Sequence, residues 1–541
     1  MTADGKDWTK PQDSRSQTVK FAGEMICPID EEQELLAVAR ETLLSSQSCI
    51  QETERFLAQL STRIKNPKIT GLPSFIHNLE KRRKTTEQLI QDLSTAPLSK
   101  EAVQLVDHKL NTCAGQVSKS VTHWDVLKRC RSFVAVNRAF QGSDKASRNA
   151  EIAKVSNMTS REKELAHRTM KQQSKVEVHV VEGGAEWVDV RTIMPDRLAR
   201  QMTDGAWGWG EHKFGDVVDE EEWRDILIAK QLKRLIAAAR LNRHEYRVPR
   251  LRVVLPNIDR NTTDVNVFLD QLTRLDPSVY VVFEDRHSAF LRTHPPNIDR
   301  AIRSLVGSEF DSLTSTLNLD HTILINLVSD ITHLRLEPQP WQAESTIAQI
   351  EEETSHSGLM TKEIYPILQG RRLVCTKEAA KHFHYVLSTV GTSSERERGD
   401  LLVPFKEPYK SVPHAVIRVR LQELSIYPLP DMIQMPVTIM DETWTLSSIQ
   451  RNFQTLHLPA VALDVAQRSG FKKSKLSILL YGWASGNVTL SSNKEIKAHL
   501  RTLVEKYRQH NDDYGPTIWR FHVTRNLLST SSSPRHDTLA D

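Results

Sequence analysis

The sequence has few cysteines, and they do not form a recognisable framework. Its 541 residues include only Cys27, Cys49, Cys113, Cys130 and Cys375, with no Cys-x-x-Cys pair among them. An odd and dispersed set is typical of neither a disulfide-stapled secreted domain nor a zinc module. The histidines show no HExxH pattern, so zinc catalysis has no support either. The cysteines therefore indicate a reducing compartment.

Long apolar runs and a leader are also missing. No stretch approaches the length of about 18 apolar residues that a membrane-spanning helix needs. The N-terminal residues, MTADGKDWTKPQDSRSQTVK, have no apolar centre and are unlike a secretory signal. Walker, GxSxG and GxGxxG motifs are absent as well. We expect no membrane partner and a location in the cytoplasm, the nucleus or both.

What is present predicts an α+β multidomain protein. Hydrophobic residues make up 39% of the chain and charged residues 26%, so most of it can fold around soluble cores. The net charge of +4 is small for this length, which argues against a protein that coats DNA. From composition and periodicity we expect a disordered N-terminus at 1–28, a helical module at 29–135, a linker at 136–174, an α/β domain at 175–310, a second α/β domain at 311–527 with an inserted loop at 338–360, and a disordered tail at 528–541.

Two patterns support the first α/β domain. The stretch KVEVHVVEGGAEWVDV, 175–190, alternates apolar and polar residues around Gly-Gly and predicts a β-hairpin. RLRVVLPNI, a helical segment and VYVVFED then predict a β-α-β unit with buried strands. Further strands are expected at 411–424, 435–440 and 516–523, and helices near 445–455 and 493–508.

The stretch TSTLNLDHTILINLVSDITH, 314–333, places a carboxylate where a β-prone segment meets a helical pattern. Asp320 stands at that junction, before apolar residues that recur at helical spacing. One interpretation is a helix cap, which Asp provides well and which stabilises a helix by about 1 kcal/mol. The other is the first member of an acidic metal site. The residue types alone leave both interpretations open.

Several segments carry a family resemblance. LNLDHTILINLVSDIT, RRLVCTKEAAKHFHYVLSTVGTSSERERGDLL and EVHVVEGGAEWVDV resemble the eukaryotic family of uncharacterised proteins whose C-terminal part is called domain of unknown function 1308. The resemblance covers roughly residues 174–450, and its most specific parts are the Asn-Leu-Asp segment and the GTSSERER block. The C-terminal part is similar, more distantly, to PIN-like nuclease domains. This resemblance implies a three-layer α/β/α domain for the C-terminal region.

A PIN-like domain gathers three or four carboxylates at one end of a parallel sheet and holds Mg²⁺ or Mn²⁺, which prefer hard oxygen ligands. The resemblance therefore implies a metal-dependent phosphodiester hydrolase acting on RNA. Asp320, Glu378 and Asp441 are the expected catalytic and metal-binding residues. The sequence departs from the pattern at one point, because His382 stands one turn after Glu378, where a second acid would match better.

Each of these carboxylates also has a plain structural interpretation. Glu378 lies at a helix start, where an acid favours the positive end of the helix dipole. Asp441 follows a β-prone run and precedes a helix, so it could be an ordinary cap. In GTSSERERGD, Glu395 and Glu397 are secondary candidates for the metal site, yet such a stretch is also typical of a solvated, salt-bridged turn.

Basic residues suggest two nucleic-acid contacts. Lys81, Arg82, Arg83 and Lys84 form the densest basic run, and Arg396 and Arg398 alternate with the acids of the GTSSERER block. The first run lacks interleaved aromatic residues that would stack on bases, and a solvated helix face explains it equally well.

Two functions follow as alternatives: a ribonuclease of the PIN type, or a catalytically inactive scaffold that binds RNA or, through its N-terminal helices, other proteins. Three carboxylates within reach of one ion would favour the nuclease, and two or fewer would favour the scaffold.

Overall fold

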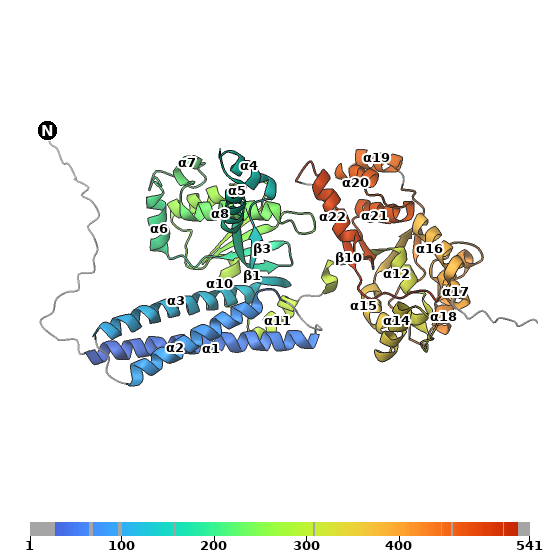
Figure 1. Ribbon diagram of the computed structural model, residues 1–541, viewed down its shortest axis with the longest axis horizontal. Coiled ribbons are helices and arrows are strands. Elements are labelled where there is room, and N and C mark those ends of the chain that lie inside the picture. The colour runs from blue at the N-terminus through green and yellow to red at the C-terminus, as the bar shows by residue number, and fades with distance from the viewer. Residues whose placement is uncertain are drawn as a thin grey trace, which may run out of the picture. The chain divides into compact units, whose positions relative to one another are not determined.

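The structure, a computed structural model, describes residues 28–63, 69–95, 100–155, 157–306, 309–444, 446–455, 458–511 and 513–528 (Figure 1). The predicted disordered N-terminus, up to residue 27, and the tail beyond Leu528 lie outside these segments. The chain divides into two compact units, residues 1–129 with 295–302, and residues 130–294 with 303–541. Within the described segments, no helix combines the length and apolar character needed to cross a membrane.

The first unit contains three long helices, α1 (Pro28–Arg63), α2 (Leu72–Thr95) and α3 (Lys100–Arg129). One core of this unit gathers Ala39, Leu89, Leu93, Val106 and Leu110, which recur at helical spacing and are all buried. In the same unit, Trp124 Nε1 donates a hydrogen bond of 2.8 Å to Glu52 on α1.

The second unit begins with a five-stranded sheet, and one of its strands lies in the interval predicted to be a linker. Its strands are β1 (Phe133–Gln141), β2 (Lys175–Glu182), β3 (Glu186–Val190), β4 (Arg250–Leu255) and β5 (Val281–Asp285), in the order β1-β2-β3-β4-β5. β1 pairs antiparallel with β2, with Arg138 opposite Val178. The interval 136–174 therefore contains a strand that belongs to the sheet, and is no free linker. The apolar residues of this strand directly follow the helical pattern of α3, which hid them in the sequence.

The rest of that interval forms α4 (Lys145–Ala153) and α5 (Ser160–Gln173). Asp144 caps α4, and Thr159 with Glu162 forms a capping box at the start of α5. α5 buries none of its residues, which explains why its composition looks like that of a linker.

The hairpin and the β-α-β unit form where the sequence predicts them. β2 and β3 pair antiparallel across Gly183 and Gly184, whose φ angles of 54° and 76° are the left-handed values that a tight turn requires. β3, β4 and β5 are parallel, and a helix joins β4 to β5. The helices of this region are α6 (Pro195–Asp204), α7 (Glu220–Trp223), α8 (Leu227–Leu241), α9 (Thr263–Thr273) and α10 (Ala289–Arg292). The next helix, α11 (Ile298–Val306), begins within residues 295–302, which belong to the first unit.

A second five-stranded sheet lies in the C-terminal half of the chain. Its strands are β6 (Thr316–Leu319), β7 (Arg372–Thr376), β8 (Thr438–Met440), β9 (Val488–Ser491) and β10 (Ile518–Arg520). They are all parallel and follow the order β10-β9-β6-β7-β8. Chain order thus runs outward from β6 to β8, then crosses to the other side of β6 for β9 and β10.

Both faces of this sheet are covered. Side chains alternate along β7, so Leu373 and Cys375 join one hydrophobic core while Val374 joins another. The helices that contribute to these cores are α12 (His321–Asn326), α15 (Leu359–Leu368), α16 (Lys377–Val390), α17 (Ser393–Leu402), α19 (Leu446–Gln454), α20 (Val461–Arg468), α21 (Lys473–Ser485) and α22 (Ile496–Tyr507). This half of the chain also contains α13 (Asp330–His333), α14 (Glu344–Ser355) and α18 (His414–Glu423). Together the two units make a mixed α+β protein with two sheets rich in parallel strands.

Two sequence predictions in this half are wrong. The inserted loop expected at 338–360 contains α14, whose inward face buries Thr346, Ile350 and Glu353 at helical spacing. The strand expected at 411–424 is α18, which starts after Pro413 and buries Ile417. Its β-branched residues favour a strand, but Pro at the helix start and packing override that propensity.

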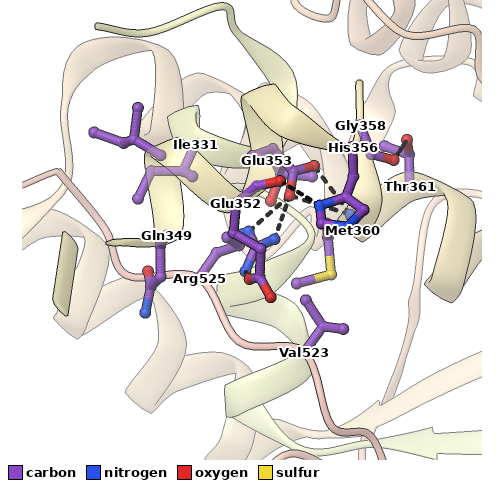
Figure 2. A network of polar contacts seen from close by, with 12 residues as sticks. Ile331, Gln349, Glu352, Glu353, His356, Gly358, Met360, Thr361, Val523 and Arg525 are labelled. Carbon is purple, nitrogen blue, oxygen red and sulfur yellow. Dashed lines mark hydrogen bonds and ion pairs between the residues drawn. The ribbon is translucent and has the colours of Figure 1, made fainter. Parts of the chain in front are cut away.

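Residues 521–528, which follow β10, have no regular secondary structure, yet hydrogen bonds and ion pairs hold them in place. Arg525 donates through Nε to Glu353 on α14 at 2.9 Å and through Nη1 to Glu352 at 2.9 Å (Figure 2). Its backbone N–H donates to Asn326 Oδ1, and Asn526 N–H donates to Gln349 Oε1. These contacts fasten the C-terminal segment to α12 and α14.

Candidate functional site at the carboxyl end of the parallel sheet

The crossover in strand order marks the place where a site is expected. In open α/β sheets, ligands bind beyond the carboxyl ends of the strands where the strand order reverses. Here that point lies between β6 and β9, and their register pairs Leu319 with Leu490. The next residue of each strand is Asp320 on one side and Ser491 on the other, so these two side chains meet at the crossover.

Asp320 is buried, with 1% of its surface exposed. Its Oδ2 accepts hydrogen bonds from Ser491 Oγ at 2.6 Å and Thr322 Oγ1 at 3.2 Å. Its Oδ1 lies 2.6 Å from His321 Nδ1. Burial raises the pKa of Asp320, but the contact and charge of His321 with the two hydroxyls outweigh burial, so the pKa lies below its usual value. Asp320 is therefore a buried carboxylate held in its charged form.

The cap interpretation of Asp320 is wrong for its side chain. Asp320 occupies the N-cap position of α12, with φ −71° and ψ 152°, but its carboxylate makes no capping hydrogen bond to the helix backbone. The carboxylate instead joins the end of β6 to the end of β9. Thr376, which ends β7, makes the equivalent capping bond for α16 and accepts from Ala379 N–H.

Two histidines lie beside this carboxylate. The rings of His321 and His382 are 5.2 Å apart between centroids, in an edge-on arrangement. Burial, the charge of His321 and the charge of Lys472 lower the pKa of His382, against the opposing effect of Asp320. One turn after Glu378, α16 thus carries an imidazole, His382, in edge-on contact with the imidazole of His321.

Glu378 lies at the start of α16, directly after β7, the strand next to β6. Its side chain is half-buried, and its Oε2 is buried without a hydrogen-bond partner among the described residues. Asp320 Oδ1 likewise accepts no hydrogen bond of good geometry within that part of the chain. Glu378 Oε2 thus has no donor among the described residues, and Asp320 Oδ1 has only the close contact with His321 Nδ1.

Asp441 follows β8 and is exposed. β8 pairs with β7 and not with β6, so Asp441 starts about two strand spacings, roughly 10 Å, from Asp320. In the segments that the structure describes, no group of three or more His, Cys, Asp or Glu side chains is placed to hold one metal ion. Asp320, Glu378 and Asp441 thus share one edge of the sheet without converging on one point.

The GTSSERER block has a structural role instead of the expected one. Glu395 is fully buried and accepts backbone N–H groups from Thr392, Asp330 and Leu528, each at 3.0 Å. Burial raises the pKa of Glu395, and these amides oppose that effect. The carboxylate of Glu395 therefore binds backbone amides of the fold, and the prediction that it belongs to a metal site is wrong.

Arg398 corrects the predicted nucleic-acid contact in the same block. Its side chain is 1% exposed, pairs with Asp330 at 2.7 Å and donates to the carbonyl oxygens of Val328 and Leu424. A nucleic acid cannot reach it. Arg396 and Glu397 are exposed, and Arg396 Nε donates to Leu387 O.

The basic run on α2 is partly neutralised by neighbouring acids. Arg83 pairs with Glu87 at 2.8 Å, one turn along the helix. Lys81 and Lys84 are exposed and line a groove of about 640 Å³ that also contains Glu80 and Asp92. Arg82 is half-buried. This run remains a predicted contact, with carboxylates at its edge.

Sequence reasoning missed Ser491, the residue that completes the environment of Asp320. The only signal was the short run Val-Thr-Leu after Gly486, too brief to be recognised as a strand. The four buried free cysteines that the structure describes take no part in this site.

Comparisons with protein-family models, with curated proteins and with solved structures find no match for this chain.

Proposed function

We propose that this protein is a binding scaffold built on a PIN-like domain, and that it does not hydrolyse phosphodiesters. The PIN-like interpretation is supported by five parallel strands, by a crossover between β6 and β9, and by hydrophobic cores on both faces of the sheet. An acid directly after β6 also fits the pattern, because Asp320 stands there.

The observation that carries the proposal is the contact between Asp320 and Ser491. At the crossover, the end of β9 supplies a hydroxyl that donates at 2.6 Å to the carboxylate. A hydroxyl adds no negative charge for a divalent cation, whereas metal-dependent phosphodiester cleavage uses several anionic oxygens around the ion. With His382 beside Glu378 and Asp441 two strands away, at most two carboxylates remain near one point.

In this proposal the charged Asp320 has a structural task. It fixes the ends of the two central strands to each other and orients His321. Partners bind elsewhere on the surface, and RNA and protein are both candidate partners.

The direct test incubates the full-length protein with a labelled single-stranded RNA and 5 mM Mn²⁺, and follows the RNA on a denaturing gel. We expect intact RNA, with Asp320→Asn indistinguishable from the parent. Cleavage by the parent that Asp320→Asn abolishes would overturn the proposal. Glu397→Gln, a change at an exposed acid, is the matched control: a contaminating nuclease would cleave RNA in this preparation and in Asp320→Asn alike, whereas the protein's own site would lose activity only in Asp320→Asn.

A second candidate, the divalent-metal-dependent ribonuclease, is favoured by one observation. Glu378 Oε2 is a buried acceptor with no donor among the described residues, and Asp320 Oδ1, at the end of the neighbouring strand, has only the close contact with His321 Nδ1. If Mg²⁺ or Mn²⁺ bound here, Asp320 and Glu378 would hold it, and the ion would supply charge stabilisation at a phosphate. The same gel assay separates the two candidates.

A further inference from the structure

A basic groove lies between α4 and α5, in the interval that the sequence presents as a linker. It has a volume of about 720 Å³ and is lined by five basic side chains and one carboxylate. The carboxylate, Glu164, pairs with Arg168 at 2.6 Å one turn along α5. Lys145, Lys163 and Lys171 are exposed and show no ion pair within the described segments. The groove therefore carries a net positive charge that the protein does not neutralise.

Hydrogen bonds of the buried Arg148 hold the floor of the groove in place. Arg148 is buried and donates through Nη1 to the backbone oxygen and the hydroxyl of Ser143. Its Nε donates to His167 Nδ1 at 3.4 Å, which links α4 to α5. Because Nδ1 accepts, the neutral ring carries its proton on Nε2. That Nε2 is buried and has no hydrogen-bond partner among the described residues. An unused donor thus lies among cations.

We propose that this groove binds the phosphate backbone of a single-stranded nucleic acid. Lys163, Arg168 and Lys171 lie along one side of α5 and span about 12 Å, a length over which a strand presents several phosphates. The exposed side chains of Lys145, Lys163, Arg168 and Lys171 supply donors to phosphate oxygens. No Phe, Tyr or Trp side chain lines the groove, so binding rests on phosphate contacts and is independent of sequence.

Other anionic partners fit less well. An anionic membrane surface would require exposed apolar side chains within the groove, but Leu165 does not line the groove, and Ile152, which does, is buried. An acidic peptide binds only where its carboxylates happen to match the positions of the cations. A nucleic-acid strand carries one phosphate on every nucleotide, so any stretch of it meets the cations.

The test measures binding of a 5′-labelled 20-nucleotide poly(U) RNA by fluorescence anisotropy, in EDTA, between 50 and 300 mM salt. With four exposed cations engaged, log K should fall against log salt with a slope of about −3. The double variant Lys163→Ala, Lys171→Ala should bring the slope to about −1.5, with affinity reduced about tenfold or more at 100 mM salt. Both positions are exposed on a helix where Ala is well tolerated, so folding should be unaffected.

The matched control is Lys406→Ala, Lys410→Ala, which removes the same charge from two exposed positions that belong to neither the groove nor any other candidate binding site. This control should bind like the parent. Equal binding by the groove variant and the parent would overturn the proposal, and so would a larger loss in the control. Binding of poly-glutamate in preference to RNA would overturn it as well, in favour of an acidic peptide. Because EDTA removes divalent metal, no metal-dependent cleavage occurs in this assay. The outcome is therefore independent of whether the protein hydrolyses RNA.

Discussion

Replacing Arg525 with alanine should lower the free energy of unfolding by about 3–5 kcal/mol, because it leaves a buried charge without its partner. Arg525 is 1% exposed and its ion-pair partner Glu353 is 4% exposed. Glu353 also accepts from Met360 N–H at 3.0 Å, which positions the carboxylate where the guanidinium reaches it (Figure 2). Urea unfolding at pH 7 measures the change.

A double-mutant cycle identifies the cause. Glu353→Ala alone should also be strongly destabilising, and the double variant should cost clearly less than the two single changes together. Arg224→Ala is the control, since Arg224 is about half exposed and its nearest carboxylate contact is 3.6 Å away; its change should stay below about 1 kcal/mol. A loss of under 1 kcal/mol for Arg525→Ala would contradict the role of this ion pair in holding the C-terminal segment.

Acid should destabilise the C-terminal half through His333. Burial, with the charge of Arg398, lowers the pKa of His333 from 6.5 to about 4. His333 Nε2 donates to Leu327 O at 2.7 Å and Nδ1 lies 2.9 Å from Ser425 Oγ, so the ring is satisfied in its neutral form. The unfolded chain takes up the proton first as pH falls. The stabilising contribution is therefore complete above pH 6.5 and is lost as pH falls toward 4, by about 3 kcal/mol in total.

The measurement is the free energy of unfolding in urea at pH 7 and at pH 4.5, for the parent and for His333→Gln. We expect the variant to be less stable at pH 7 and to lose clearly less stability on acidification. His414→Gln changes an exposed histidine, so it should lose as much stability between pH 7 and pH 4.5 as the parent does. If His333→Gln and the parent lose equal stability between the two pH values, this account of His333 is wrong.

The sequence predicted an element correctly where its residue pattern fits only one kind of secondary structure. Alternation around Gly183 and Gly184 predicts the β2–β3 hairpin, and two buried apolar runs around a helical segment predict β4 and β5. Prediction from the sequence was wrong where contacts with distant parts of the chain determine the secondary structure. β1 follows α3 after only a few residues, and α5 consists mostly of polar residues and buries none of its side chains. β1 has no local signature that distinguishes it from a linker. The start of α5 has one, the capping box of Thr159 and Glu162, but no apolar stripe follows it.

The candidate site was predictable only in part, for a related reason. Asp320 was recognisable because a strand-to-helix junction places one residue at the edge of a sheet. Its partner Ser491 is 171 residues away in the chain, so no local pattern connects them. Glu395 and Arg398 looked like exposed charges of a turn, yet both are buried by contacts from α13, α18 and the C-terminal segment.

Whether Asp320 belongs to the fold or to a metal site is tested most directly by the effect of Mn²⁺ on the melting temperature of the parent and of Asp320→Asn. Asn keeps an acceptor for Ser491 but removes the negative charge that a cation needs. Asp441→Asn, at an exposed acid on the same edge of the sheet, serves as the control. Since a ligand that binds only the folded state raises its melting temperature, the scaffold account predicts equal shifts, or none, in all three proteins at saturating Mn²⁺. A rise of several degrees in the parent and in Asp441→Asn that is absent in Asp320→Asn would contradict it.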